Sequence, residues 1–262
     1  MDWLDINVLT FQYFILVFAR LLSMVAMSPI IGSGNVPGPV KVGLSFMLSL
    51  VIFPVVSRNF PMLPDTMIMF WVLVVREVLV GMLVGVVTNL MFSAVQLSGQ
   101  IFGIQVGFGI VNVIDPMSEN QISILGQFEF LIAILLFLAI NGHHVLVRII
   151  ADSYLILPMD SFTFTEPLGM EVTKWLSKMF VIAFKIGMPM IFTLLLVSAG
   201  LGIIARTVPQ MNVFIVGLPL KIFVGLVVMG ASMMYIAYLL RGYFDMMFRD
   251  LVMMMKMAGG ML

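Results

Sequence analysis

Charged residues lie inside several long apolar segments of this sequence, and the candidates for a functional role among them are Arg20, Arg76, Glu77, Lys185 and Lys221. Glu129 lies within a further apolar segment, residues 122–140. A charged side chain is costly in hydrocarbon, so such residues mark ion or substrate paths unless they form structural ion pairs. Arg76 and Glu77 are adjacent, and on a helix they would point about 100° apart, which makes them poor partners for each other. We expect each to find a partner on another helix or on another chain.

The sequence carries no pattern typical of an enzyme. It has no phosphate-binding loop, no cysteine and no His-Glu-x-x-His motif. His143 and His144 are neighbours, so they do not form the i, i+4 pair of a helical zinc site, and only a metal site carried by a loop stays open. Ser98 and Ser118 lack the tight turn and histidine partner of a serine hydrolase. We therefore expect no catalytic residue and no cofactor.

The composition is that of an integral membrane protein. Of 262 residues, 62% are hydrophobic and 10% are charged, and the mean hydropathy is +1.17. A soluble domain carries about 25% charged residues. The 13 basic and 13 acidic residues balance, which argues against a nucleic-acid partner. The 26 methionines fill irregular gaps or form a surface that seals against several partners.

The pattern predicts an all-α chain with six main apolar segments. A membrane-spanning helix needs about 20 apolar residues. The segments are residues 11–31, 41–56, about 67–105, 122–140, 180–204 and 213–240. Residues 160–178 hold much of the remaining charge and are the best candidate for a solvent-exposed section. The tail, residues 241–262, is predicted to continue as an amphipathic helix.

The third segment is longer than a membrane is thick. A helix over residues 67–105 would reach roughly 58 Å at 1.5 Å per residue, whereas the hydrocarbon core is about 30 Å thick. This helix must therefore protrude far or break near its middle.

Small and polar residues form a stripe along this helix, at spacings of three or four that place them on one face. Small residues permit close helix packing, and the polar ones indicate protein partners or water. The stripe is either an ordinary helix–helix interface inside one bundle or a pore-facing or subunit-packing surface. Its members are Glu77, Gly81, Gly85, Asn89, Ser93, Gln96, Gln100, Gly103 and Gly107.

A glycine-bearing loop follows, at about residues 103–121. Gly107 and Gly109 flank Phe108, and Asp115-Pro116 sets a turn. Irregular backbone at membrane depth is tolerated inside protein or along a cavity. The loop is either a channel plug or gate, or a plain connection between helices.

A secondary transporter for a small solute is the main competing interpretation of these features. Such transporters show broken helices and internal repeats around a midplane site. This chain is short, and no repeat relates its two halves. A purely structural membrane scaffold is a further alternative.

The chain resembles the FliR/SctT family of type III secretion export-gate proteins over nearly its whole length. The most specific block is residues 204–221, which contains a polar turn, Arg206 to Asn212, between two apolar segments. The matching residues are Arg20, Ser28-Pro29-Ile30, Val36-Pro37, Lys41, Leu44-Ser45, the 103–121 loop, Ile204-Ala205-Arg206, Pro209-Gln210-Met211-Asn212-Val213-Phe214, Gly217, Pro219 and Lys221.

The resemblance implies a non-enzymatic pore component of the flagellar basal body in the bacterial inner (cell) membrane, partly at its periplasmic face. The fold would be a bundle of long, bent helical hairpins that packs into a helical hetero-oligomer. The partners would be FliP-like and FliQ-like proteins, with FlhB-like and FlhA-like export proteins, flagellar rod proteins and membrane lipid. Residues 1–178 would resemble a FliP-like subunit, and residues 179–262 a FliQ-like hairpin. An injectisome homologue is the alternative within this family.

The resemblance also implies roles for two segments. The plug would be formed by Gly107, Phe108, Gly109, Ile110, Val111 and Val113. A cytoplasmic-side turn would contain Arg206, Pro209, Gln210 and Asn212. The resemblance also implies periplasmic termini, whereas the Lys/Arg distribution over six spans would place both termini in the cytoplasm. We prefer the placement that the resemblance implies, because segments embedded in an assembly need not follow a rule for lipid-facing spans.

Overall fold

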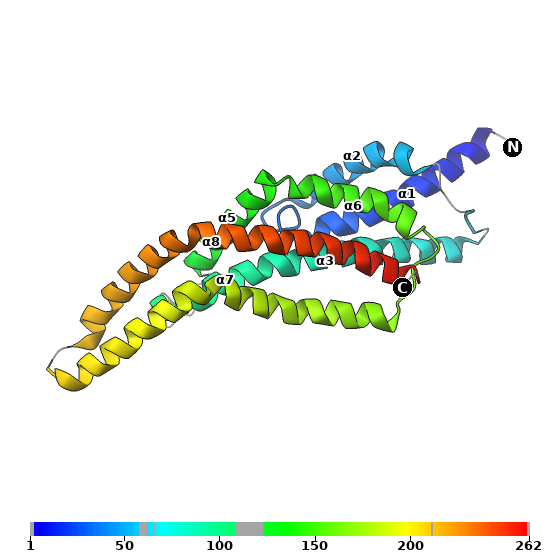
Figure 1. Cartoon of the computed structure of the whole chain (residues 1–262). Helices are drawn as coiled ribbons and strands as arrows, with labels where there is room; N and C mark the ends of the chain where they lie inside the picture. Colours follow the sequence, from blue (N-terminus) through cyan, green and yellow to red (C-terminus); the bar gives the residue numbers. More distant parts are fainter. Residues whose placement is uncertain (1–2, 58–61, 65, 108–122, 211, 261–262) are drawn as a thin grey trace. The chain divides into compact units, whose positions relative to one another are not determined.

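The protein is all-α, as the apolar pattern predicts. The computed structural model describes residues 3–57, 62–64, 66–107, 123–210 and 212–260, and these ranges contain helices and no strand. The helices are α1 (Trp3–Met27), α2 (Gly38–Val56), α3 (Met67–Val106), α5 (Ile124–Ala139), α6 (Gly142–Ile156), α7 (Glu166–Thr207) and α8 (Val213–Ala258). Figure 1 shows them along the chain.

The long helix expected at about residues 67–105 is confirmed, since α3 is a continuous helix of 40 residues. The tail continues as a helix as far as Ala258, where α8 ends, as predicted. One expectation is wrong in part. Residues 160–178, expected to be exposed, contain the start of α7, and Leu168, Glu171 and Trp175 there are buried. The apolar residues between the charges supply this buried face.

The helices are long and apolar enough for a membrane bundle. Among the described residues, five stretches meet the length and hydropathy of a spanning helix, namely Val8–Met27, α2, α3, α7 and Ile215–Ala258. Helices α5 and α6 together would make a sixth. This agrees with the six apolar segments of the sequence.

The chain forms two compact units, and long helices contribute to both. Unit 1 contains Met1–Met91, Asn141–Leu176 and Phe244–Leu262, and unit 2 contains Phe92–Ile140 and Ser177–Tyr243. The predicted division between residues 1–178 and 179–262 concerns a likeness to two other proteins, and it stays a prediction.

Unit 1 is built around α1. Helix α2 runs back along α1, since Phe14 contacts Phe53 and Phe46 at ring distances of 5.9 and 5.3 Å, and Phe18 also contacts Phe46. The end of α8 is tied in by backbone and side-chain bonds to the segment before α7. Thr163 N donates to Ala258 O at 3.0 Å, and Thr165 Oγ1 donates to a neighbouring carbonyl oxygen of α8.

Unit 2 has α3 and α5 as an antiparallel pair. At one end of the pair Phe92 contacts Phe130 and Phe137, at ring distances of 5.9 and 5.4 Å. At the other end the helices nearly touch, because a methyl group on Gly99 would lie 2.5 Å from Gly126 Cα. Glycine at these positions lets the two backbones approach closely.

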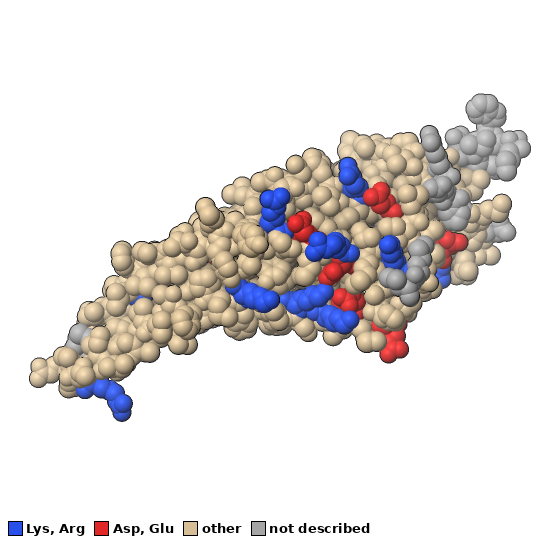
Figure 2. Space-filling view, viewed as in Figure 1, with Lys and Arg blue, Asp and Glu red and all other residues tan. Residues whose placement is uncertain are grey.

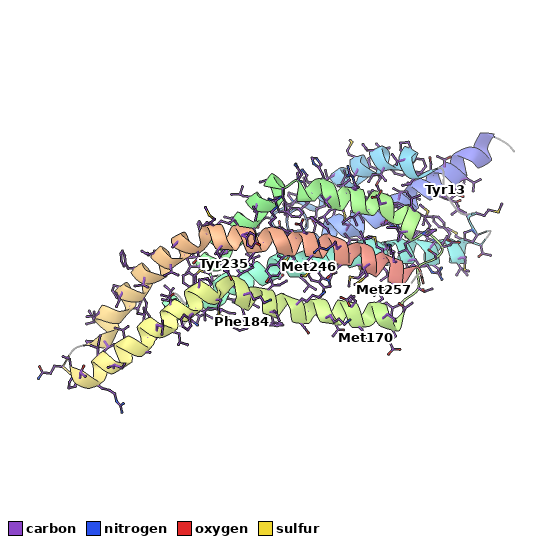
Figure 3. All side chains as sticks on the ribbon, in the orientation of Figure 1. Tyr13, Met170, Phe184, Tyr235, Met246 and Met257 are labelled. Carbon is purple, nitrogen blue, oxygen red and sulfur yellow. The ribbon has the colours of Figure 1, made fainter. Side chains whose placement is uncertain are left out.

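Large apolar side chains remain exposed along the long helices. Phe184 on α7 and Tyr235 on α8 are 50% and 44% exposed, and both project from the ribbon in Figure 3. On the face shown in Figure 2, long stretches of the surface are tan, the colour of residues other than Lys, Arg, Asp and Glu. Extended apolar surface marks a membrane or protein contact.

Candidate functional site

A buried ion pair joins α1 to α3 in unit 1. Arg20 Nε lies 2.5 Å from Glu77 Oε2, and Arg20 Nη2 donates to Glu77 Oε1 at 2.8 Å. The side chains are 0% and 1% exposed. Two parallel bonds between a guanidinium and a carboxylate make a strong, directional pair. Glu77 was predicted to need a partner on another helix, and Arg20 on α1 is that partner.

Helix α6 completes the surroundings of Arg20. Arg20 Nη1 donates to Ser153 Oγ at 2.7 Å, and Arg20 Nη2 donates to Leu157 O at 3.3 Å. The guanidinium carbon also lies 4.0 Å from the centre of the Tyr154 ring, a cation–π contact. Three helices therefore meet at one buried arginine, which gives this cluster a positioning role rather than an open binding site.

The stripe on α3 begins as an interface with α1. A methyl group on Gly81 would overlap Arg20 O and Ser23 Oγ, and one on Gly85 would lie 2.5 Å from Met27 Cβ. Asn89 Nδ2 donates to Met27 O at 3.4 Å. This half of the stripe is therefore a helix–helix interface inside the chain, one of the two alternatives that the sequence left open.

The second half of the stripe lies in unit 2. Ser93, Gln96 and Gln100 line a hollow of about 410 Å³ with residues of α5 and α7. Gly103 faces Ser123, the residue that caps α5 by accepting a bond from Gly126 N at 3.3 Å. This half of the stripe therefore lines a hollow within unit 2.

The remaining predicted charges lie apart from the buried pair. Arg76 donates to Asp160 O at 2.7 Å. Lys185 is exposed on α7, and Lys221 is half-buried. Lys221 lines a cavity of about 420 Å³ with residues 104–107 and parts of α7 and α8. Among the described residues, none of these three forms a salt bridge with a buried carboxylate.

The predicted plug falls mostly outside the described residues. Gly107 is described, with a φ of 109° and its backbone N–H bonded to Ile104 O at 3.2 Å. A glycine in this conformation is a common helix end. Residues through Val106 are helical, so the loop starts later than residue 103. Phe108, Gly109, Ile110, Val111 and Val113 lie outside the described part of the chain.

The predicted polar turn connects α7 to α8. Arg206 is in the last turn of α7, and Arg206, Pro209, Gln210 and Asn212 are all exposed. Asn212 caps α8, because its Oδ1 accepts a bond from Ile215 N at 3.4 Å. An asparagine at this position satisfies one of the unpaired donors at a helix start.

Sequence reasoning missed two buried polar residues of unit 2, Ser98 on α3 and Glu129 on α5. Glu129 carried a signal, since it is the only charged residue of a strongly apolar segment. Ser153 and Tyr154 were missed as well, because only the packing of α6 brings them to Arg20.

Comparison with known proteins identifies the family. Residues 11–247 match the family described as bacterial export proteins, family 1. Flagellar biosynthetic protein FliR of Bacillus subtilis (strain 168) is 34% identical over 252 residues, which cover 95% of this chain and 96% of the relative. FliR of Escherichia coli (strain K12) is 32% identical with 83% of each chain covered, and FliR of Aquifex aeolicus (strain VF5) is 30% identical with 90% of each covered.

The family description is that of an export component, and the apolar helices are those of a membrane protein. The chain therefore belongs to the bacterial export proteins of family 1, alongside flagellar FliR, and is a membrane-embedded component of flagellar export.

Proposed function

We propose that this chain is a pore-forming component of the flagellar type III protein export gate. It conducts unfolded export substrates across the inner membrane as one member of a helical hetero-oligomer. The observation that carries this proposal is the likeness to flagellar FliR over 95% of the chain. The flagellar name of the relatives above also favours a flagellar gate over an injectisome or a solute transporter.

The proposed neighbours are FliP-like and FliQ-like proteins, with residues 1–178 taking the place of a FliP-like subunit and residues 179–262 that of a FliQ-like hairpin. The exposed side chains support extensive contact with other chains. Lys185 is exposed on α7 beside Phe184 and Met188, which are 50% and 53% exposed. A cation among apolar residues is costly against lipid, so a partner subunit that supplies a carboxylate or water suits this face.

We assign the channel plug to the loop after α3. The positive φ of Gly107 ends the helix there, and Phe108, Ile110, Val111 and Val113 follow in the sequence. An apolar constriction excludes water and ions until it is displaced. We assign the polar turn between α7 and α8 to the cytoplasmic entrance; its residues are Arg206, Pro209, Gln210 and Asn212. Part of the assembly is assigned to the periplasmic face of the membrane. FlhB-like, FlhA-like and rod proteins would meet the assembly at its two ends.

Native mass spectrometry of the detergent-extracted chain tests the assembly. The chain is expressed alone and together with its FliP-like and FliQ-like proteins. We expect a single copy held in a large hetero-oligomer when all three are present. A monomer or homo-oligomer that ignores those proteins would contradict the gate and favour solute transport.

A loop deletion tests the plug. Removal of residues 107–112 is expected to make cells leak ions, because the apolar residues that close the channel are lost. Phe164→Ser is the control, since Phe164 is 76% exposed in the segment before α7 and far in sequence from the loop. If the deletion leaves membrane tightness and secretion equal to those of the control, this loop is not the plug.

A further inference from the structure

Glu129 is a buried acid in the middle of α5. Its side chain is 2% exposed, and it is the only charged residue of that helix. The Ser98 hydroxyl on α3 lies close enough to interact with its carboxyl group. Among the described residues, neither the Ser98 hydroxyl oxygen nor either carboxyl oxygen of Glu129 has a partner at hydrogen-bonding geometry. A charge in this position would be isolated from both water and counter-charge.

The other buried acids of the described chain have a cation. Glu77 binds Arg20 through both carboxylate oxygens, and Glu171 lies 2.9 Å from Lys174 Nζ. Both pairs belong to unit 1. A buried carboxylate stays charged when such a partner offsets its lost hydration, and it takes up a proton otherwise.

Unit 2 holds no buried cation in its described residues. The part of α3 in this unit and α5 contain no lysine, arginine, histidine or tyrosine. Lys178 and Lys185 on α7 and Lys221 on α8 are half-buried or exposed. The other titratable groups of α7 and α8 in this unit are also outside the core: Arg206, Tyr235, Tyr238, Arg241 and Tyr243.

Ser98 lies at a close meeting of helices. A methyl group on Gly187 of α7 would lie 3.0 Å from Ser98 Oγ, and the Gly99–Gly126 contact of α3 with α5 is next to it. Glu129 follows Gly126 by three residues, on the same face of α5. An ionised carboxyl group here would draw water into this close contact between helices.

We propose that Glu129 is a proton-binding site inside unit 2. The carboxyl group holds one proton on an oxygen and is a neutral acid at neutral pH, beside the Ser98 hydroxyl. The bound proton is what allows α5 to pack against α3 and α7 at this point. This inference does not depend on the proposed pore function.

Infrared spectroscopy of the full chain in lipid tests the proposal without any substitution. Glutamates carry a carbon-13 label in the side-chain carboxyl group, and the spectrum is taken at neutral pH. We expect an isotope-shifted C=O stretch of a protonated carboxylic acid. Only carboxylate bands from the labelled glutamates would overturn the proposal, because Glu129 would then be ionised.

Substitutions assign the band to a residue. Glu129→Gln is expected to abolish the band while assembly and swimming stay at the level of the unchanged protein, since the amide is a neutral mimic of the acid. Glu77→Gln is the matched control, which should keep the band and lose assembly because Arg20 is left unpaired. Persistence of the band in Glu129→Gln, or loss of assembly in that variant, would refute a neutral Glu129.

Discussion

The Arg20–Glu77 pair makes the sharpest stability prediction for this protein. Glu77→Gln keeps the shape of the side chain but removes the negative charge beside a guanidinium that is 0% exposed. Removing one partner of a buried ion pair costs about 3–5 kcal/mol, because the other charge is left uncompensated. At 1.4 kcal/mol for each tenfold change, the ratio of folded to unfolded protein should fall by about a hundredfold to several thousandfold.

A double substitution separates the charge from the packing. Arg20→Leu with Glu77→Leu removes both charges, and replacing a whole buried pair with apolar residues is often neutral or stabilising. Leu157 O would still lose the Nη2 donor at 3.3 Å, and Ser153 Oγ keeps its own bond to Ile150 O at 2.6 Å. The double variant should therefore lose about 1–3 kcal/mol, the cost of an unpaired buried acceptor.

The assay is reversible unfolding of the chain in lipid–detergent mixtures, followed by circular dichroism. The coupling energy is read from the cycle of four proteins: the unchanged protein, Arg20→Leu, Glu77→Leu and the double variant. The reasoning would be refuted if Glu77→Gln were as stable as the unchanged protein. It would also fail if the double variant were less stable than either single one.

Two further predictions concern helix contacts and caps. Gly81→Ala should destabilise unit 1 by about 1–3 kcal/mol through overpacking, because the added methyl group would overlap Arg20 O. Gly43→Ala is the control and should be neutral or stabilising, because Gly43 has open space around it. Equal thermal unfolding temperatures for the two variants would contradict the close α1–α3 contact. Asn212→Ala should cost about 0.5–2 kcal/mol through loss of the α8 cap, and Asn212→Asp should restore it in the same thermal assay.

Much of the fold follows from local sequence. The apolar runs and the proline-free stretch predict the 40-residue α3 to within a residue or two, because helix formation depends on neighbours three and four residues apart. The adjacent charges inside an apolar segment predict that Arg76 and Glu77 each need a partner outside their own helix. The burial within residues 160–178 was not predicted, because the many charges there favour exposure although Leu168 and Trp175 form a buried face.

The partners themselves could not be predicted. Arg20 and Glu77 are 57 residues apart in the chain, and Ser153 is 133 residues from Arg20. Nothing in the local pattern distinguishes Glu77, which has a cation, from Glu129, which has none in the described chain. The half-buried Arg76 and the exposed Lys185 show the same pattern in the sequence, a charge inside an apolar segment, as the buried charges.

By itself, the sequence determined that this is an all-α membrane protein, where its helices lie, and, through its family, that it serves flagellar export. Composition and periodicity suffice for this, because burial in a membrane is a property of each segment. Only the tertiary structure decided which face of α3 packs on α1, which charges are neutralised, and that Glu129 lies next to Ser98. Those outcomes depend on contacts between segments far apart in the chain, and a carboxyl group has the same identity in the sequence whether its neighbour is an arginine or a hydroxyl group.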